Sequence, residues 1–225
     1  MLYAAIAENS LSVLSQCFHG YVAAHLTDER VVGRARPVHF NMWEATYFDL
    51  FKEKLHRLVD AAAQLGVERF ILDDGWFKNR RSERAGLGDW WVDKTLFAEG
   101  SAPLTENFLA KGMEFGLWLE PKMVNPDSDL YRAHPDWVLH ANPAPVLLAR
   151  NQLVLDLSRP EVQDDLFERV DTLLAEYPIT YLKWDMNRTI SQPGDCLGRA
   201  AGHRNTLALY QLMARIRSAH PRVKI

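Results

Sequence analysis

The chain has 225 residues, of which 48% are hydrophobic, and this is enough apolar material for a large core in one domain or most of one. Its net charge of -3 provides no broad cationic surface, so we do not expect a nucleic-acid partner. The two cysteines, Cys17 and Cys196, lie far apart without metal-ligand spacing, which favours reduced thiols over a disulfide framework or a zinc site. No basic leader opens the sequence and no apolar run reaches membrane-spanning length, so we expect a soluble, cytoplasmic protein without a membrane partner.

The first 36 residues are predicted to contain one amphipathic helix and a linker. Apolar residues within 10–26 recur close to the spacing of a single helical face, and Asn9 or Ser10 can cap the start of this helix. Residues 27–36 are polar and basic, as in a connector. We therefore expect a separate N-terminal element that precedes the main domain.

Residues 37–225 alternate short apolar runs with amphipathic helical segments. Strands are predicted at 37–43, 67–72, 115–119, 153–157 and 179–184, and a sixth begins at 222–225. Helices are predicted at 47–65, 104–111, 127–134, 160–176 and 205–219. This alternation is typical of a parallel sheet with crossover helices, and no glycine-rich phosphate loop marks a doubly wound sheet. We predict an α/β fold, namely a partial (β/α)8 TIM-type barrel with strands 1 to 5 and the start of strand 6.

Acidic residues recur at or near the ends of the predicted strands, and this pattern also favours a barrel over an open sheet. They are Glu44, Asp73, Asp74, Glu120, Asp156 and Asp185. Parallel barrels place their chemistry at the carboxyl ends of the strands, where loops meet around one mouth. We therefore expect these carboxylates to converge there, with Asp156 in a structural role.

The stretch 181–188 (Tyr-Leu-Lys-Trp-Asp-Met-Asn-Arg) carries the most distinctive polar pattern. Lys183 and Asp185 alternate on one side of the predicted strand, and Asn187 follows at the same spacing. Lysine and aspartate are rarely buried unless they are paired or used, so the alternatives are an ion pair that closes the barrel end and a functional site.

Tryptophans beside the strand-end carboxylates favour a carbohydrate site. Charged acceptors and donors bind sugar hydroxyls, while an aromatic ring covers the apolar face of a pyranose. Clustered acids also suit Mg²⁺ or Mn²⁺, but no histidine accompanies them and Lys183 would repel a cation near Asp185. We therefore expect neither a metal nor another cofactor.

The motifs at the strand ends resemble the catalytic barrel of glycoside hydrolase family 36, the microbial α-galactosidases. They are Trp-Glu-Ala-Thr-Tyr-Phe at 43–48, Leu-Asp-Asp-Gly-Trp-Phe at 72–77, Gly-Leu-Trp-Leu-Glu-Pro at 116–121 and Lys-Trp-Asp-Met-Asn-Arg at 183–188. The stretches 150–157 and 134–137 match as well, so the resemblance covers nearly the whole chain from about residue 37. Several ordered motifs at matching spacing form a far more specific signal than any single one.

This resemblance implies a retaining glycosidase that releases terminal α-galactose from galactosides such as melibiose and raffinose. It implies that Asp185 is the nucleophile. The residues that it implies for substrate binding are Asp73, Asp74, Trp43, Trp118, Arg150, Lys183 and Asn187. The alternatives are an α-N-acetylgalactosaminidase of the same family and a non-catalytic or degenerate fragment that binds galactose.

Two departures from the family pattern affect these expectations. The family usually has Glu-Pro-Glu-Met where this chain has Glu-Pro-Lys-Met at 120–123, which reverses a charge near the mouth. The family's acid/base carboxylate comes from a later strand, so we expect these residues alone to be inactive or severely impaired. Unpaired strands at the ends of a partial barrel also expose apolar edges, so we expect association, with a homo-oligomer as one outcome.

Overall fold

The computed structural model describes residues 4–8, 10–27, 33, 35–98, 102–141 and 143–225. The chain divides into two compact units, Met1–Pro37 and Val38–Ile225. The first contains helix α1 (Leu11–His25), in which the Ser10 side chain accepts a hydrogen bond from the backbone N–H of Val13, as expected for an N-cap. The predicted helix is therefore confirmed, while Asn9 and most of the predicted connector lie outside the described residues.

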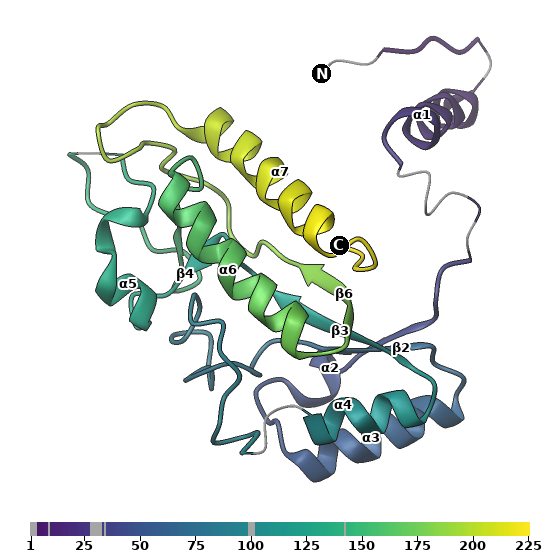
Figure 1. The fold of residues 1–225 in the computed structure, drawn as a ribbon. Helices are drawn as coiled ribbons and strands as arrows, with labels where there is room; N and C mark the ends of the chain where they lie inside the picture. Colours follow the sequence, from purple (N-terminus) through teal and green to yellow (C-terminus); the bar gives the residue numbers. More distant parts are fainter. Residues whose placement is uncertain (1–3, 9, 28–32, 34, 99–101, 142) are drawn as a thin grey trace. The chain divides into compact units, whose positions relative to one another are not determined.

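The second unit is built on a four-stranded parallel sheet with the order β1-β2-β3-β6. Its strands are β1 (His39–Asn41), β2 (Arg69–Leu72), β3 (Glu114–Leu119) and β6 (Ile179–Trp184). Its longer helices are α3 (Lys52–Gln64), α4 (Ala102–Ala110), α6 (Pro160–Glu176) and α7 (Gly202–Ala219). Figure 1 shows α3 beside α4 and α6 beside α7 along the sheet. The predicted α/β class is confirmed, and the sheet of the described residues is an open segment of a barrel.

The predicted fourth strand, 153–157, is not part of this sheet. Within it only β5 (Leu153–Val154) is a strand, and it pairs antiparallel with β4 (Met123–Val124), so β3 contacts β6 directly. The apolar run is buried outside the sheet, where its backbone is hydrogen-bonded to Lys122 and Leu139. Burial alone does not distinguish that position from a barrel strand. Of the predicted last strand, the structure has one isolated bridge, in which Lys224 pairs parallel with Tyr181 of β6.

The remaining short elements lie in the connections after β1 and β4. They are α2 (Trp43–Thr46), α5 (Asp129–Ala133) and the 3-10 helix η1 (Pro135–Trp137). Helix α3 begins later than the predicted residue 47, because Tyr47 ends α2 with a left-handed φ of 47°. No helix in the described part of the chain is long and apolar enough to cross a membrane.

Side-chain alternation gives the sheet two chemically different faces. On the outer face, the Phe108 ring of α4 stacks between Phe70 of β2 and Phe115 of β3, at centroid distances of 4.9 Å and 5.2 Å. Alternate residues, such as Arg69 and then Asp73 beyond the end of β2, belong to the other face. Polar side chains therefore gather on the inner face, where a closed barrel has its interior.

Candidate active site

Three carboxylates follow neighbouring strands at the same edge of the sheet. Asp73 follows β2, Glu120 follows β3 and Asp185 follows β6. Because these strands are parallel and adjacent, their carboxyl ends lie at one edge. The convergence predicted from the sequence is therefore correct for these three residues.

Asp73 is held by two side chains from other strands. Lys183 Nζ of β6 lies 2.7 Å from Asp73 Oδ2, and Asn41 Nδ2 of β1 donates to the same oxygen. The Asp73 side chain is 4% exposed, while that of Lys183 is 35% exposed. In this ion pair, Asp73 is therefore buried and Lys183 is partly exposed at the mouth.

Asp185 has donors on both carboxylate oxygens. Trp118 Nε1 and Asn187 Nδ2 donate to Oδ2 at 2.9 Å and 3.0 Å, and the backbone N–H of Met186 donates to Oδ1 at 2.8 Å. Burial raises the pKa of Asp185, but these three hydrogen bonds and the charge of Lys183 outweigh it and leave the pKa below its ordinary value. Asp185 is therefore an ionised, oriented and partly exposed carboxylate at neutral pH.

Glu120 anchors the loop that carries Asp185. Its side chain is fully buried, and it accepts hydrogen bonds from the backbone N–H of Asn187 and from Gln152 Nε2 at 3.1 Å. Burial raises the pKa of Glu120 above its ordinary value, and the nearby charge of Asp185 acts in the same direction. Glu120 thus positions Asn187, which in turn contacts Asp185.

Asp74 lies in a different environment from its neighbour Asp73. Both of its oxygens accept hydrogen bonds from the buried Arg80, at 2.9 Å and 2.8 Å. Burial raises the pKa of Asp74 even against the opposing effect of Arg80. Asp74 and Arg80 form a buried ion pair, and the role of Asp74 in binding a hydroxyl stays a prediction.

Arg150 and Trp43 border the group formed by the other predicted residues. Arg150 Nη1 lies 3.3 Å from Asn187 Oδ1, and its backbone adopts the left-handed conformation with a φ of 52°. The backbone N–H of Trp43 donates to Asn41 Oδ1 at 2.8 Å, and the half-buried ring packs edge-on against Phe48. Arg150 is thus connected to Asp185 through the side chain of Asn187, and Trp43 is connected to Asp73 through that of Asn41.

Two of the strand-end acids have separate local roles. Glu44 is exposed and accepts a hydrogen bond from the Tyr47 hydroxyl, and Asp156 accepts from the backbone and side chain of Ser158. The expected convergence is therefore wrong for these two carboxylates. Glu44 lies in α2, beyond the end of β1, and Asp156 follows β5, which is not a strand of the parallel sheet. The structural role predicted for Asp156 agrees with its contacts.

Sequence analysis missed two residues that support the site. Asn41 is the last residue of β1 and follows the same strand-end rule as the acids, so its position could have indicated it. Gln152 precedes β5, and its contact with Glu120 depends on a tertiary arrangement that no local pattern indicates.

The arrangement suits recognition of a neutral polyol next to a nucleophilic carboxylate. Lys183 and Asn187 supply donors, Asp73 and Asp185 supply acceptors, and Trp118 lies directly beside Asp185. Among the described residues, no group of three or more His, Cys, Asp or Glu side chains is arranged to hold a metal ion.

Comparison with known proteins gives the family. The melibiase family model matches residues 1–225. The chain belongs to the melibiase family. It is 43% identical over 226 residues to the α-galactosidase of Escherichia coli and 42% identical over 222 residues to α-galactosidase AgaA of Geobacillus stearothermophilus. These alignments cover 99% and 96% of this melibiase-family chain but 31% and 30% of the relatives, so the chain spans about a third of their length.

Solved structures agree with this assignment. The glycoside hydrolase family 36 α-galactosidase AgaB of Geobacillus stearothermophilus matches with a TM-score of 0.90 and 43% identity, over 96% of this chain and 31% of that one. A variant of AgaA in complex with raffinose matches with a TM-score of 0.91 and 41% identity, over the same shares. The resemblance predicted from the strand-end motifs is confirmed.

Proposed function

We propose that this melibiase-family chain is the nucleophile-bearing part of a retaining α-galactosidase that acts on galactosides such as melibiose and raffinose. The observation that carries the proposal is the Asp185 carboxylate, which lies ionised at a strand end with three fixed donors. The relatives support the substrate class, because they are named α-galactosidases and solved variants of AgaA hold raffinose and stachyose.

In the proposed reaction, Asp185 attacks the anomeric carbon of the galactose ring. One Asp185 oxygen forms a bond to that carbon while the bond to the leaving oxygen breaks, which gives a covalent glycosyl-enzyme. Water then cleaves this ester and releases galactose with its original anomeric configuration. The hydrogen bond from Trp118 keeps Asp185 ionised before attack and holds it in position.

The galactose ring lies against the inner face of the sheet in this proposal. Asp73, with its partner Lys183, receives ring hydroxyls, and Asn187 and Arg150 donate on the side of the loop. The remaining proposed contacts are Asp74, as a hydroxyl acceptor, and Trp43 and Trp118, as apolar walls.

Both half-reactions require a second carboxyl group that donates a proton to the leaving oxygen and later activates water. We place this acid/base outside these 225 residues, in agreement with the roughly one third of the relatives' length that they span. General acid-base assistance contributes about 10² to 10⁴ in rate, and it matters most for poor leaving groups. The 225 residues alone should therefore be nearly inert on melibiose and should react only with a galactoside whose leaving group needs no proton.

Intact-mass spectrometry after exposure to a dinitrophenyl α-galactoside tests the proposal. We expect one galactosyl adduct on Asp185, which azide removes, and no adduct in Asp185→Asn. Asp156→Asn is the matched control, because it also removes a buried strand-associated carboxylate but should keep the adduct. An adduct on another residue would overturn the assignment of Asp185 as the nucleophile. Rapid melibiose turnover by the 225 residues would overturn the placement of the acid/base outside them. A preference for the dinitrophenyl N-acetylgalactosaminide over the galactoside would overturn the proposed substrate class.

A further inference from the structure

Arg150 and Asn151 form a tight two-residue turn that carries Arg150 to the candidate active site. Ala149 and Gln152 pair antiparallel on either side of this turn, and the Gln152 N–H donates to the Ala149 carbonyl at 3.0 Å. Both turn residues have a left-handed backbone, with φ of 52° at Arg150 and 58° at Asn151. Asparagine and glycine are preferred at such positions, so Asn151 suits its place and Arg150 does not. A strained residue of this kind persists only where surrounding contacts hold the backbone.

Arg188 supplies one set of these contacts from the loop after β6. It is 8% exposed, and its Nη1 donates to the backbone carbonyl of Gln152 at 2.5 Å and to that of Leu147 at 3.0 Å, on the two sides of the turn. Its other nitrogens bind within its own loop, Nε to the Thr189 carbonyl and Nη2 to Ser191 Oγ, both at 3.0 Å. All of these acceptors are neutral oxygens, so the buried guanidinium joins two backbone segments.

Asn125 supplies a second set of contacts. It is fully buried, and its Nδ2 donates to the Asn151 carbonyl at 2.7 Å and to the Glu83 carbonyl at 3.2 Å. Its Oδ1 accepts from Arg80 Nη1 at 3.0 Å and from the Leu87 N–H at 2.9 Å. These four hydrogen bonds use the full capacity of an amide side chain. Asn125 thus ties the turn to the long loop that follows β2.

The turn is connected to the proposed nucleophile through Asn187. Arg150 Nη1 lies 3.3 Å from Asn187 Oδ1, while Asn187 Nδ2 donates to Asp185 Oδ2 at 3.0 Å. A guanidinium can only donate, so this contact keeps the amide oxygen toward Arg150 and the amide nitrogen toward Asp185. The Arg150 side chain is also 56% exposed and therefore remains accessible to a substrate hydroxyl.

We propose that Arg188 and Asn125 are positioning residues, which hold the Arg150–Asn151 turn so that Arg150 contacts both Asn187 and the galactoside. Arg188 lies three residues after Asp185 in the same loop, so its side chain couples the turn to the segment that carries the nucleophile. The effect on the galactoside rests on the proposed function, whereas the support of the turn rests on the contacts of Arg188 and Asn125 alone.

Hydrogen exchange of the backbone amides in the 225-residue chain tests the support of the turn. Arg188→Lys keeps the charge but loses the planar fork of donors, and Asn125→Asp keeps the acceptor but loses the donor to the Asn151 carbonyl. In each variant we expect the Gln152 amide, which closes the turn, to exchange at least about fivefold faster, the scale of one lost hydrogen bond.

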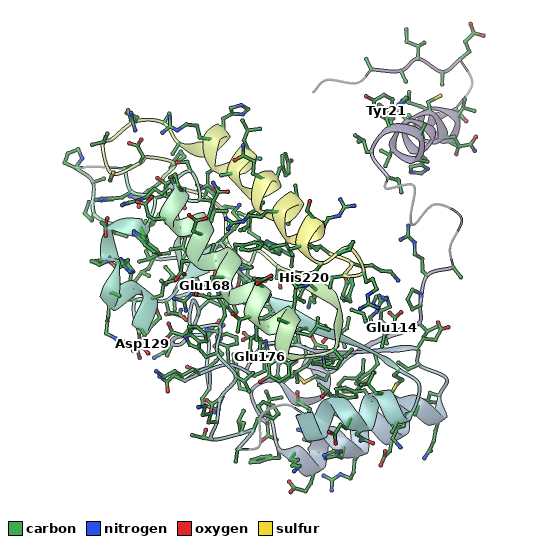
Figure 2. The ribbon with its side chains drawn as sticks, in the orientation of Figure 1. Tyr21, Glu114, Asp129, Glu168, Glu176 and His220 are labelled. Carbon is green, nitrogen blue, oxygen red and sulfur yellow. The ribbon has the colours of Figure 1, made fainter. Side chains whose placement is uncertain are left out.

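Arg169→Met is the matched control for these variants. This guanidinium is also largely buried, at 12% exposed, but its partner is Asp165 on its own helix. Arg169 follows Glu168, which Figure 2 labels on α6. The exchange of the Gln152 amide should be the same in Arg169→Met as in the natural protein.

The rate of galactosyl adduct formation from the dinitrophenyl α-galactoside tests the consequence for the sugar. Arg150→Met and Arg188→Lys should each raise the half-saturating concentration about tenfold and change the limiting rate much less. The double variant should match Arg150→Met alone, because Arg188 acts through Arg150. A residue that only stabilised the fold would give losses that multiply.

Unchanged exchange of Gln152 in Arg188→Lys and Asn125→Asp would overturn the proposal. Equal acceleration in Arg169→Met would overturn it as well, as would losses that multiply in the double variant. If the natural protein forms no adduct while Gln152 responds as expected, the proposed function fails and the support of the turn stands. If Arg188→Lys does not fold, the exchange in Asn125→Asp decides the question.

Discussion

The inner face of the sheet carries a charged cluster at each end, and the two clusters are built differently. At the amino ends of the strands, which we name the base cluster, His39, Arg69 and Glu114 are register partners across β1, β2 and β3. Arg69 Nε donates to Glu114 at 2.8 Å, Arg69 Nη1 lies 3.0 Å from His39 Nε2, and the guanidinium lies 4.7 Å from the centre of the Tyr181 ring. The mouth cluster of Asp73, Lys183 and Asp185 lies at the carboxyl ends.

In the base cluster, the central residue is Arg69, and its side chain contacts other residues of the inner face. Arg69 is 2% exposed, and its guanidinium contacts a carboxylate, an imidazole and an aromatic ring. In the mouth cluster, Asp185 and Lys183 remain partly exposed. The two clusters thus differ in which residue is buried. The base cluster buries its cation, Arg69, while Glu114 is 42% exposed and His39 is exposed; the mouth cluster buries an anion, Asp73, and keeps Lys183 and Asp185 in place but partly accessible.

The largest expected difference between the clusters concerns Asp185. In the full-length polypeptide, Asp185→Asn should lower kcat on melibiose by about 10⁴-fold or more, because an amide cannot form the proposed covalent intermediate. Thermal stability should change little, because the amide oxygen can still accept a hydrogen bond. Glu114→Gln in the base cluster is the matched control and should keep kcat. Equal losses of kcat in the two variants would contradict the inference that the mouth cluster, and not the base cluster, serves the chemistry.

The next effect concerns the stability of the base. Arg69→Met should lower the free energy of unfolding by about 1–3 kcal/mol, because it removes the charge-assisted hydrogen bonds that a buried guanidinium makes to Glu114, a carboxylate that is itself 42% exposed. Urea unfolding measures this loss. Arg132→Met, which breaks two exposed ion pairs on α5, should change stability little. If both variants unfold at the same urea concentration, Arg69 does not have the stabilising role inferred here.

Local sequence patterns predicted the mouth cluster well because its geometry is local. Lys183 and Asp185 are two positions apart near the end of one strand, so alternation alone places them on the same face. Asp73 needed only the additional rule that parallel strands align their carboxyl ends. The sequence alone therefore predicted both the identity of these residues and the location of the site.

Elements outside the sheet were predicted less well. The buried run at 153–157 matched a barrel strand in length and composition, but its neighbours in space are β4 and Val138. The partner of Asp74 is Arg80, six residues along a long loop, and no periodic pattern fixes that contact. These failures concern long-range packing, which short motifs do not encode.

Lys122 is a buried cation on the mouth side that has no carboxylate partner among the described residues. It is 4% exposed, and the only hydrogen-bond contact of its ammonium group among the described residues is Met186 Sδ at 3.5 Å. Burial lowers its pKa below the ordinary 10.5. Lys122→Met should therefore raise the free energy of unfolding by about 1–3 kcal/mol at pH 7, because it removes a buried charge and keeps the side-chain volume.

The pH dependence of Lys122→Met provides the check. A lowered lysine pKa means that the destabilisation is fully present below the folded-state pKa and is relieved as the pH rises toward 10.5. The advantage of the variant, measured by urea unfolding, should shrink over that range. Lys111→Met, at a more exposed ion pair with Asp60, serves as the control and should show no such gain. A Lys122→Met protein that is less stable at pH 7 would mean that the ammonium has a stabilising partner.

The smallest expected effect concerns His39 of the base cluster and tests whether Arg69 keeps its imidazole neutral. Arginine can only donate, so the contact of Arg69 Nη1 with His39 Nε2 requires a lone pair on that nitrogen and hence a neutral imidazole. Burial lowers the pKa of His39 below 6.5, Arg69 and Lys224 lower it further, and Glu114 opposes them. Between the folded-state pKa and 6.5 the unfolded chain binds more protons, so stability should rise with pH across that window. Urea unfolding from pH 5 to 8 should show this rise in the natural protein and in His203→Gln, a control on α7, but not in His39→Gln. If His39→Gln retains the full rise, another group is responsible and the imidazole does not depend on Arg69 for its neutral state.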